Sequence, residues 1–391
     1  MKELILSVKD DVINWRRHLH QIPEIGNDLP ETSAYVAKQL DDMGISYEKG
    51  VGIEHAIVAT IKGEKAGEGK TMALRADMDA LPVVETTGLE FAATNGKMHA
   101  CGHDAHTAIL LGAAKVLNQM KDKFSGTVKL FFQPGEEISA GAEPMVKAGA
   151  MKDVDGVLGI HVGNISPESK PGVAYFKDGP MMACLDKWFM TITGVGAHGA
   201  YPHSSHDPVV MQAHVITALQ EIISRELEPV DPGVITVGIV QGGTAYNVIP
   251  GSVYLEGTAR AVKPETREYI AKRIGEVAEG IAKSFRGTVD YTYVHGAPPV
   301  VNNADFTYKI MESAKKAIGA ENVTMMTNPV MGGEDFAYYL QEAPGTFVFL
   351  ANPLPIDGVK YAHHNSKFAL DEQYFNSGVS LFVQSVVDFL V

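Results

Sequence analysis

The hydrophobic pattern alternates between short apolar runs and amphipathic stretches in the first half of the chain and near its end. Four apolar runs predict buried strands, at residues 71–75, 128–133, 156–161 and 346–350. Two helical patterns accompany them, one over residues 31–43 that ends at Gly44 and one over residues 105–120. This alternation is typical of an α/β fold, in which helices cover both faces of a mostly parallel sheet.

The middle of the chain has a different order of elements. The pattern predicts strands at residues 187–193, 233–240, 252–260 and 287–294, and helices at residues 208–225 and 264–285. The resulting β-α-β-β-α-β order is the ferredoxin-like arrangement, which can fold as its own unit. We therefore expect a small domain of residues 185–294, inserted into a larger domain of residues 1–184 and 295–391.

Composition supports two domains, because 391 residues exceed what one compact core usually holds. A net charge of −14 argues against nucleic acid or an anionic membrane as a partner. Two cysteines are too few for a disulfide framework, and no apolar run reaches the length of a signal peptide or a membrane span. These features predict a cytoplasmic protein.

Polar residues stand where the predicted parallel strands end. Asp77 and Asp79 come after the first strand, Glu136 and Glu137 after the second, and His161 closes the third. Open α/β sheets bind ligands beyond the carboxyl ends of their strands. We therefore expect these side chains to face one site.

The segment HACGHDAH contains Cys101 and His103, separated by Gly102, which permits the backbone turn that would present both to one ion. Glu137, His161 and a histidine of the segment HHNSKF bring the candidate metal ligands to five. Thiolate, imidazole and carboxylate are transition-metal ligands, and five exceed the four of a closed structural zinc site. The set predicts an open or two-metal catalytic site. The alternative is polar loop histidines beside a small buried cysteine.

The adjacent glutamates Glu136 and Glu137 are expected to do different work. Consecutive side chains on extended backbone point in opposite directions, so one carboxylate can bind metal while its neighbour faces the substrate as a general base. The alternative is a pair of solvated acids on a loop.

The inserted domain has its own polar candidates. His198 lies in a glycine-rich turn, Asn247 lies in the segment TAYNVIP, and Arg260 ends a predicted strand. A guanidinium group can bind a carboxylate through two parallel hydrogen bonds, although a surface ion pair is an equal alternative for Arg260. Loop histidines are usually solvated, which makes His203 and His206 bystanders.

Nine segments occur in the order found in one known family. They are RRHLHQIPEIG, RADMDALPV, HACGHDAHTA, FQPGEE, GIHVG, GAHGAYPH, NVIPG, GGEDFAYY and AHHNSKF. Together they resemble the metal-dependent aminoacylase/carboxypeptidase family, specifically its subgroup of N-acyl-amino-acid amidohydrolases, hippurate hydrolases and auxin-conjugate hydrolases. The resemblance runs from about residue 14 to residue 375 and implies a zinc-peptidase-like catalytic domain with a lid and dimerisation domain.

The resemblance also implies roles for single residues. Two divalent ions per subunit, of manganese, zinc, nickel or cobalt, would be held by Cys101, His103, Glu137, His161 and His363. Alignment of the last motif favours His363 over its neighbour His364. Glu136 matches the general base, and Asp79 matches an acid that orients a metal ligand. Asn247 and Arg260 match lid residues that hold the substrate, and His198 matches a lid histidine that polarises the scissile carbonyl in the partner subunit's site.

The expected reaction is hydrolysis of the amide bond of an N-acyl amino acid, such as an N-acetyl or N-benzoyl conjugate. Glu136 would take a proton from the attacking water and pass it to the leaving amine. An N-acetyl-diaminopimelate deacetylase, a dipeptidase or a carboxypeptidase on the same site is the alternative, because the shape of the acyl pocket decides among them. A non-catalytic metal or ligand binder would not need Glu136. The expected assembly is a homodimer, with a tetramer as the alternative.

Overall fold

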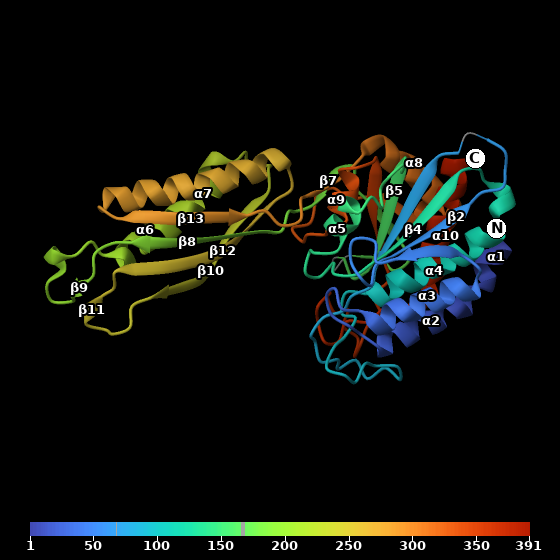
Figure 1. Cartoon of the computed structure of the whole chain (residues 1–391), viewed down its shortest axis with the longest axis horizontal. Helices are drawn as coiled ribbons and strands as arrows, with labels where there is room; N and C mark the ends of the chain where they lie inside the picture. Colours follow the sequence, from blue (N-terminus) through green and yellow to red (C-terminus); the bar gives the residue numbers. More distant parts are fainter. Residues whose placement is uncertain (68, 166–168) are drawn as a thin grey trace. The chain divides into compact units, whose positions relative to one another are not determined.

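The computed structural model describes residues 1–67, 69–165 and 169–391, which divide into two compact units (Figure 1). Unit 1 contains residues 1–179, 302–328 and 335–391, and unit 2 contains residues 180–301 and 329–334. Each unit has its own cluster of buried apolar side chains.

In the described part of unit 1, eight strands form one sheet in the order β1-β2-β4-β3-β5-β16-β6-β15. The strands are β1 (Ser46–Lys49), β2 (Ile57–Lys62), β3 (Thr71–Asp77), β4 (Thr127–Gln133), β5 (Gly156–Gly163), β6 (Ala174–Phe176), β15 (Val323–Met325) and β16 (Gly345–Ala351). The central strands β4, β3, β5 and β16 are parallel. Every residue of β5 and β16 is buried, which requires cover on both faces of the sheet.

The helices of unit 1 are α1 (Lys2–Ser7), α2 (Lys9–Gln21), α3 (Pro30–Asp42), α4 (His103–Gln119), α5 (Ala142–Lys147), α8 (Ala304–Ile318), α9 (Ala337–Leu340) and α10 (Phe375–Leu390). Helices α3, α4, α8, α9 and α10 contact this sheet, α1 and α2 pack on α4 and α10, and α5 packs on α9 (Figure 1). Helices α4 and α10 contact each other and β3, and the core joins Leu110 and Val383 of these helices to Leu74 and Leu158 of the strands. Within the described residues, no helix combines the length and apolar character needed to cross a membrane.

The predicted strands and helices of unit 1 are confirmed in place, with small shifts at their ends. Strand β3 continues to Asp77, so this residue ends the strand instead of following it. Helix α4 begins at His103, two residues before the predicted start. Both shifts place candidate site residues on regular elements, which restricts their directions.

Unit 2 contains a four-stranded antiparallel sheet in the order β10-β12-β8-β13, counted over the residues that the structure describes. Its elements are β7 (Gly179–Met182), β8 (Asp186–Thr193), β9 (Ala197–His198), α6 (Pro208–Glu221), β10 (Gly233–Gly242), β11 (Val248–Ile249), β12 (Ser252–Ala261), α7 (Pro264–Ser284), β13 (Thr288–Val294) and β14 (Val300–Asn302). Helices α6 and α7 pack against each other and the sheet. Alternate residues of β13 are exposed, as expected when helices cover one face.

Candidate metal centre

The candidate ligands of unit 1 meet at the carboxyl end of the parallel strands. His161 lies near the end of β5, and Glu136 and Glu137 follow the end of β4. Cys101 and His103 stand at the start of α4, which packs on the same strands. Because β4, β3 and β5 are neighbouring strands, the segments that leave them lie side by side.

Donor atoms of these residues approach closely. Cys101 Sγ lies 3.4 Å from His161 Nε2, and His103 Nε2 lies 3.8 Å from Glu137 Oε1. Three overlapping groups have all their donor atoms within 4.8 Å of one another: Cys101, His103 and His161; His103, Glu136 and Glu137; Cys101, Glu137 and His364. One cysteine sulfur, several imidazoles and two carboxylates therefore lie close together.

The hydrogen bonding of these donors fits a cation. Both ring nitrogens of His103, and Oε1 of Glu137, are buried without a hydrogen-bond partner among the described residues. Leaving such atoms unsatisfied is costly, typically about 1–3 kcal/mol for each group. A divalent ion accepts electron pairs from imidazole and carboxylate, so it would satisfy His103 Nε2 and Glu137 Oε1, while His103 Nδ1 faces Asp79 Oδ1 at 3.4 Å. The donor set thus fits the metals expected from the sequence.

The local electrostatics point the same way. Burial raises the pKa of the Cys101 thiol well above its usual range, and the Glu137 carboxylate raises it further. Burial, and then the charge of His106, lower the pKa of His161. Burial opposes charging of His103, but Asp77 and other partners outweigh it and raise the pKa of His103. A bound cation favours thiolate and neutral imidazole, so it would balance the carboxylates here.

Gly102 provides the turn that the Cys101–His103 step requires. Its φ is +90°, in the left-handed region that favours glycine, and it caps the N-terminus of α4. A Cβ there would lie 3.1 Å from Val162 Cγ2 and 3.2 Å from Leu370 Cδ1. The predicted turn is therefore confirmed.

Asp79 contacts the backbone of the glutamate pair and a histidine of α4. Its two carboxylate oxygens accept the amide hydrogens of Glu136 and Glu137, each at 3.1 Å, and its Oδ1 lies 3.4 Å from His103 Nδ1. It is almost fully buried. Asp79 therefore fixes two neighbouring segments of the site relative to each other.

The expected geometry of the glutamate pair was wrong. Residues 136–139 form a turn, closed by a 2.7 Å hydrogen bond from the Ser139 amide to the Glu136 carbonyl, and not extended backbone. The two side chains consequently do not diverge: Glu136 Oε2 and Glu137 Oε1 lie 3.9 and 3.8 Å from His103 Nε2. Their roles must be argued from their partners.

The geometry of the histidine pair near the C-terminus differs from the expectation that His363 is the metal ligand. His364 Nε2 lies 3.4 Å from Glu137 Oε2 and joins the group with Cys101. His363 Nε2 instead lies 3.1 Å from the carbonyl oxygen of Val162. The geometry favours His364 as the fifth ligand.

Buried polar residues under the site were not assigned by the sequence. Arg75 Nη1 donates to Asp77 at 2.6 Å, and Arg75 Nη2 donates to Asp335 at 2.9 Å. Asp335 also accepts the amides of Gly141 and Ala142. The segments RADMD and GGEDF were the available signal, but no local pattern indicates that two residues 260 positions apart meet.

The candidate residues of unit 2 lie at two ends of its sheet. His198 on β9 pairs with Val248 on β11, and the Asn247 carbonyl accepts the Gly199 amide at 2.7 Å, so His198 and Asn247 are neighbours, both exposed. Arg260 lies near the far end of β12, where it donates to the Ala259 carbonyl at 2.9 Å. Figure 1 shows β9 and β11 at one end of the four-stranded sheet.

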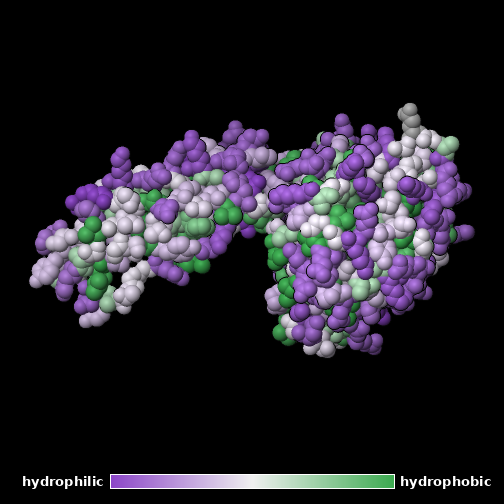
Figure 2. Space-filling model, in the orientation of Figure 1, coloured by the Kyte–Doolittle hydropathy of each residue, from purple (hydrophilic) through white to green (hydrophobic). Residues whose placement is uncertain are grey.

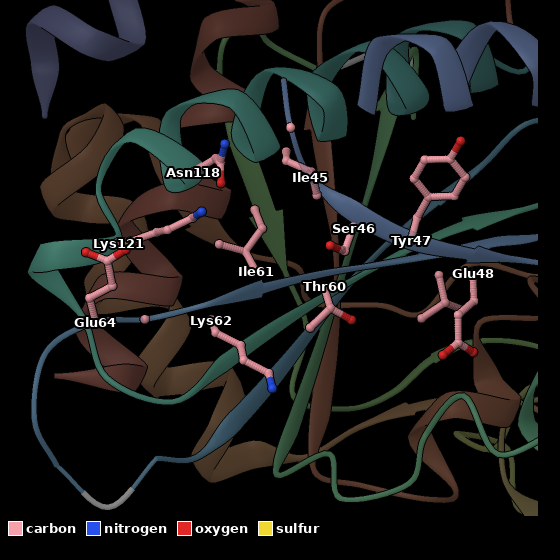
Figure 3. Close-up of a pocket in the computed structure, with 13 residues that line it drawn as sticks. Ile45, Ser46, Tyr47, Glu48, Thr60, Ile61, Lys62, Glu64, Asn118 and Lys121 are labelled. Carbon is pink, nitrogen blue, oxygen red and sulfur yellow. The ribbon is translucent and has the colours of Figure 1, made fainter. Parts of the chain in front are cut away.

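A separate pocket of about 670 Å³ lies at the β1–β2 edge of the large sheet (Figure 3). Tyr47, Glu48, Thr60 and Lys62 of these strands line it, with Lys121 beyond the end of α4. It contains none of the candidate ligands, so it does not form part of this site.

Comparisons with known proteins identify the family of this chain. Residues 73–388 match the profile of peptidase family M20/M25/M40. The chain is 38% identical over 382 residues to thermostable carboxypeptidase 1 of Saccharolobus solfataricus (97% of this chain, 95% of the relative) and 39% identical over 367 residues to N-acetyl-L-cysteine deacetylase of Bacillus subtilis (94% and 85%). The crystal structure of Bacillus subtilis YXEP, described as a dinuclear metal binding peptidase from the M20 family, has a TM-score of 0.84 at 32% identity, covering 98% of this chain and 99% of that one. The chain therefore belongs to peptidase family M20/M25/M40.

Proposed function

We propose that this protein is a two-metal amidohydrolase that cleaves the amide bond of N-acyl amino acids, releasing a carboxylate and a free amino acid. The observation that carries the proposal is the buried cluster of Cys101, His103, His161 and Glu137, with Glu136 beside it. The deacetylase and carboxypeptidase names of its relatives support amide hydrolysis. An N-acetyl-diaminopimelate deacetylase, a dipeptidase or a carboxypeptidase on the same site is the second candidate, and the carboxypeptidase name of one relative favours the last of these.

The proposed ligands are Cys101, His103, Glu137 and His161, with His364 in place of the expected His363. When bound, two ions of manganese, zinc, nickel or cobalt would supply Lewis acidity to the amide carbonyl and the attacking water. The name of the YXEP structure supports two ions. Asp79 would orient His103 and hold the turn that carries Glu137.

Glu136 is the proposed general base. It would take the proton of the attacking water and deliver it to the leaving amine, which must be protonated to depart. Its amide is held by Asp79, and its carboxylate is largely shielded from solvent. A shielded carboxylate holds its position and its proton between the two transfers.

We further propose that residues 185–294 are a ferredoxin-like lid and dimerisation domain, and that residues 1–184 and 295–391 are the catalytic domain. The strand order β10-β12-β8-β13 supports this topology. Strand β10 is an edge strand with exposed apolar residues, including Ile239 and Val240 (39% and 48% exposed). Hydrophobic side chains reach the surface of unit 2 (Figure 2). An unpaired apolar edge suits self-pairing about a two-fold axis.

The separation of the unit 2 candidates supports a site shared between subunits. Ser252 is the residue of β12 nearest to β11 in the sequence, and Arg260 stands eight positions after it. Eight steps of extended strand span about 26 Å. A small N-acyl amino acid cannot contact Arg260 and the His198–Asn247 pair of one chain together. We therefore propose that Arg260 binds the substrate carboxylate, while Asn247 holds the substrate and His198 polarises its scissile carbonyl from the neighbouring subunit.

The test is hydrolysis of N-acetyl, N-benzoyl and dipeptide substrates by protein stripped with a chelator and then reloaded with manganese, zinc, cobalt or nickel. We expect no turnover without metal, recovery with at least one metal, and preference for N-acyl amino acids with a free α-carboxylate. Full turnover by metal-free protein would contradict the metal mechanism. Stoichiometric metal binding without turnover of any amide would support the non-catalytic alternative instead.

A further inference from the structure

The backbone N–H and carbonyl oxygen of Val162 are contacted by three histidines. Its N–H donates to His106 Nε2 at 2.8 Å. Its carbonyl oxygen lies 2.9 Å from His161 Nδ1 and 3.1 Å from His363 Nε2. Both backbone polar groups of the residue that follows the proposed ligand His161 are therefore bonded to imidazoles.

The backbone N–H of Val162 can only donate and its carbonyl oxygen can only accept, and this fixes which nitrogen of each ring carries the proton. An N–H only donates, so His106 Nε2 carries a lone pair, and its proton sits on Nδ1, 2.5 Å from Asp77 Oδ1. A carbonyl only accepts, so His161 carries its proton on Nδ1. That leaves the lone pair of His161 on Nε2, the atom 3.4 Å from Cys101 Sγ. The network thus presents the ring nitrogen that a metal needs.

His106 is itself held firmly. Asp77, its carboxylate partner, accepts from Arg75 at 2.6 Å, and the Asp77 carbonyl accepts from the Thr107 hydroxyl at 2.8 Å. All of these residues are almost fully buried. A continuous chain of hydrogen bonds consequently runs from Arg75 through Asp77 and His106 to the Val162 peptide.

The place of His363 depends on a glycine. Gly163 has a φ of +132°, and a Cβ there would lie 2.2 Å from His363 Nε2. The His363 ring also packs against the rings of His161 and Phe368, with centroids 5.0 and 4.9 Å away. Gly163 therefore leaves the space through which His363 reaches the Val162 carbonyl.

We propose that His106 and His363 are positioning residues for His161, acting through the backbone N–H and the backbone carbonyl of Val162, respectively. The inference rests on the proposed function, in which His161 is a metal ligand. The two adjacent histidines near the C-terminus then have different roles. His364 faces the ions, and His363 holds the backbone next to the ligand His161. Outer partners of this kind typically change metal affinity by about 10- to 100-fold.

The test compares paired variants at each position, with Co²⁺ as the probe. Glutamine places its terminal amide near the position of Nε2, so His363→Gln can still donate to the Val162 carbonyl, and His106→Gln can still accept its N–H. His363→Ala and His106→Asn cannot. We expect the alanine and asparagine variants to bind Co²⁺ about 10- to 100-fold more weakly and to shift its visible spectrum, while the glutamine variants stay near wild type. His18→Ala, which removes an exposed histidine of the same unit, is the control.

The outcomes separate this inference from the proposed function. If wild type binds no Co²⁺, the proposed function and the inference both fall. If wild type binds two equivalents but the glutamine and alanine variants of His363 lose metal alike, His363 is a ligand and the inference alone is overturned. Unchanged affinity in every variant also overturns it. ¹⁵N NMR of histidine-labelled metal-free wild type needs no variant: His106 and His161 should both carry the proton on Nδ1, and a proton on Nε2 of either contradicts the network.

Discussion

Glu136 and Glu137 are adjacent acids that share a neighbour in His103 but differ in their other surroundings. Glu137 also approaches His364 and groups with Cys101, whereas Glu136 groups with Glu334 and Asp335. Burial raises the pKa of Glu137, and the charge of His103 opposes this rise. On these contacts we propose metal binding for Glu137 and proton transfer for Glu136.

This assignment predicts opposite effects for two matched substitutions. Glu136→Gln should keep both metal ions and lower kcat by about 10²- to 10⁴-fold, because only proton transfer is removed. Glu137→Gln should lose metal, because an amide oxygen is a poorer ligand than a carboxylate. Metal analysis beside steady-state kinetics provides the measurement. Metal loss in Glu136→Gln with retention in Glu137→Gln would mean that the two roles are exchanged.

Among the elements, the start of β8 is tied to α7 and β13 by Asp186. Its carboxylate accepts two hydrogen bonds from Arg267, at 2.6 and 2.7 Å, one from Tyr293 at 2.7 Å and one from the Gly296 amide at 2.9 Å. Burial by itself would raise the pKa of Asp186, but these donors outweigh burial and lower the pKa below its ordinary value of 3.8. One carboxylate thus joins three elements of unit 2.

The lowered pKa predicts a pH-dependent stability. Because folding lowers the pKa of Asp186, its charge contributes fully to the free energy of unfolding above about pH 4. This contribution is lost as the pH falls through the lower pKa of the folded state. Asp186→Asn leaves Arg267 without its charge partner and should lower the free energy of unfolding by about 3 kcal/mol at neutral pH. In urea unfolding of metal-free protein, the difference in free energy of unfolding between wild type and Asp186→Asn should become smaller below about pH 4.

Asp290→Asn, which changes an exposed acid of β13, is the control for that measurement and should leave stability nearly unchanged. The difference in free energy of unfolding between wild type and Asp186→Asn could instead stay constant down to about pH 2. That result would show that the carboxylate charge is not what stabilises unit 2.

For the whole molecule, the proposal of a shared site predicts complementation. His198→Ala and Glu136→Gln proteins should each be nearly inactive. After subunit exchange, a heterodimer holds one site that combines wild-type Glu136 of one chain with wild-type His198 of the other. We expect the mixture to recover up to about a quarter of wild-type activity, since random exchange makes half the dimers mixed and each has one working site.

Exchange itself must be shown, for example by mass spectrometry of isotopically labelled subunits. Mixed dimers without activity would place His198 at the site of its own chain or outside catalysis. A monomer at assay concentration would remove the basis of the shared site.

The sequence by itself determined many of the helices and strands, because hydrophobic periodicity and turn residues act locally. It located the central strands, α4 and the turn at Gly102, and it placed Cys101, His103 and His161 around one site. Helices α2 and α10 were not predicted, although both are amphipathic and both contact α4.

Only the tertiary structure decided the directions of side chains. The turn at residues 136–139 brings both glutamates to His103, and His364 adopts a φ of +66° while its amide bonds to the Ala100 carbonyl, so His364 and not His363 meets Glu137. The meeting of Arg75 with Asp335, and of His106 with the Val162 peptide, likewise joins distant segments. Such contacts depend on how strands pair and helices pack, and no local period encodes them, because they form between residues far apart in the chain.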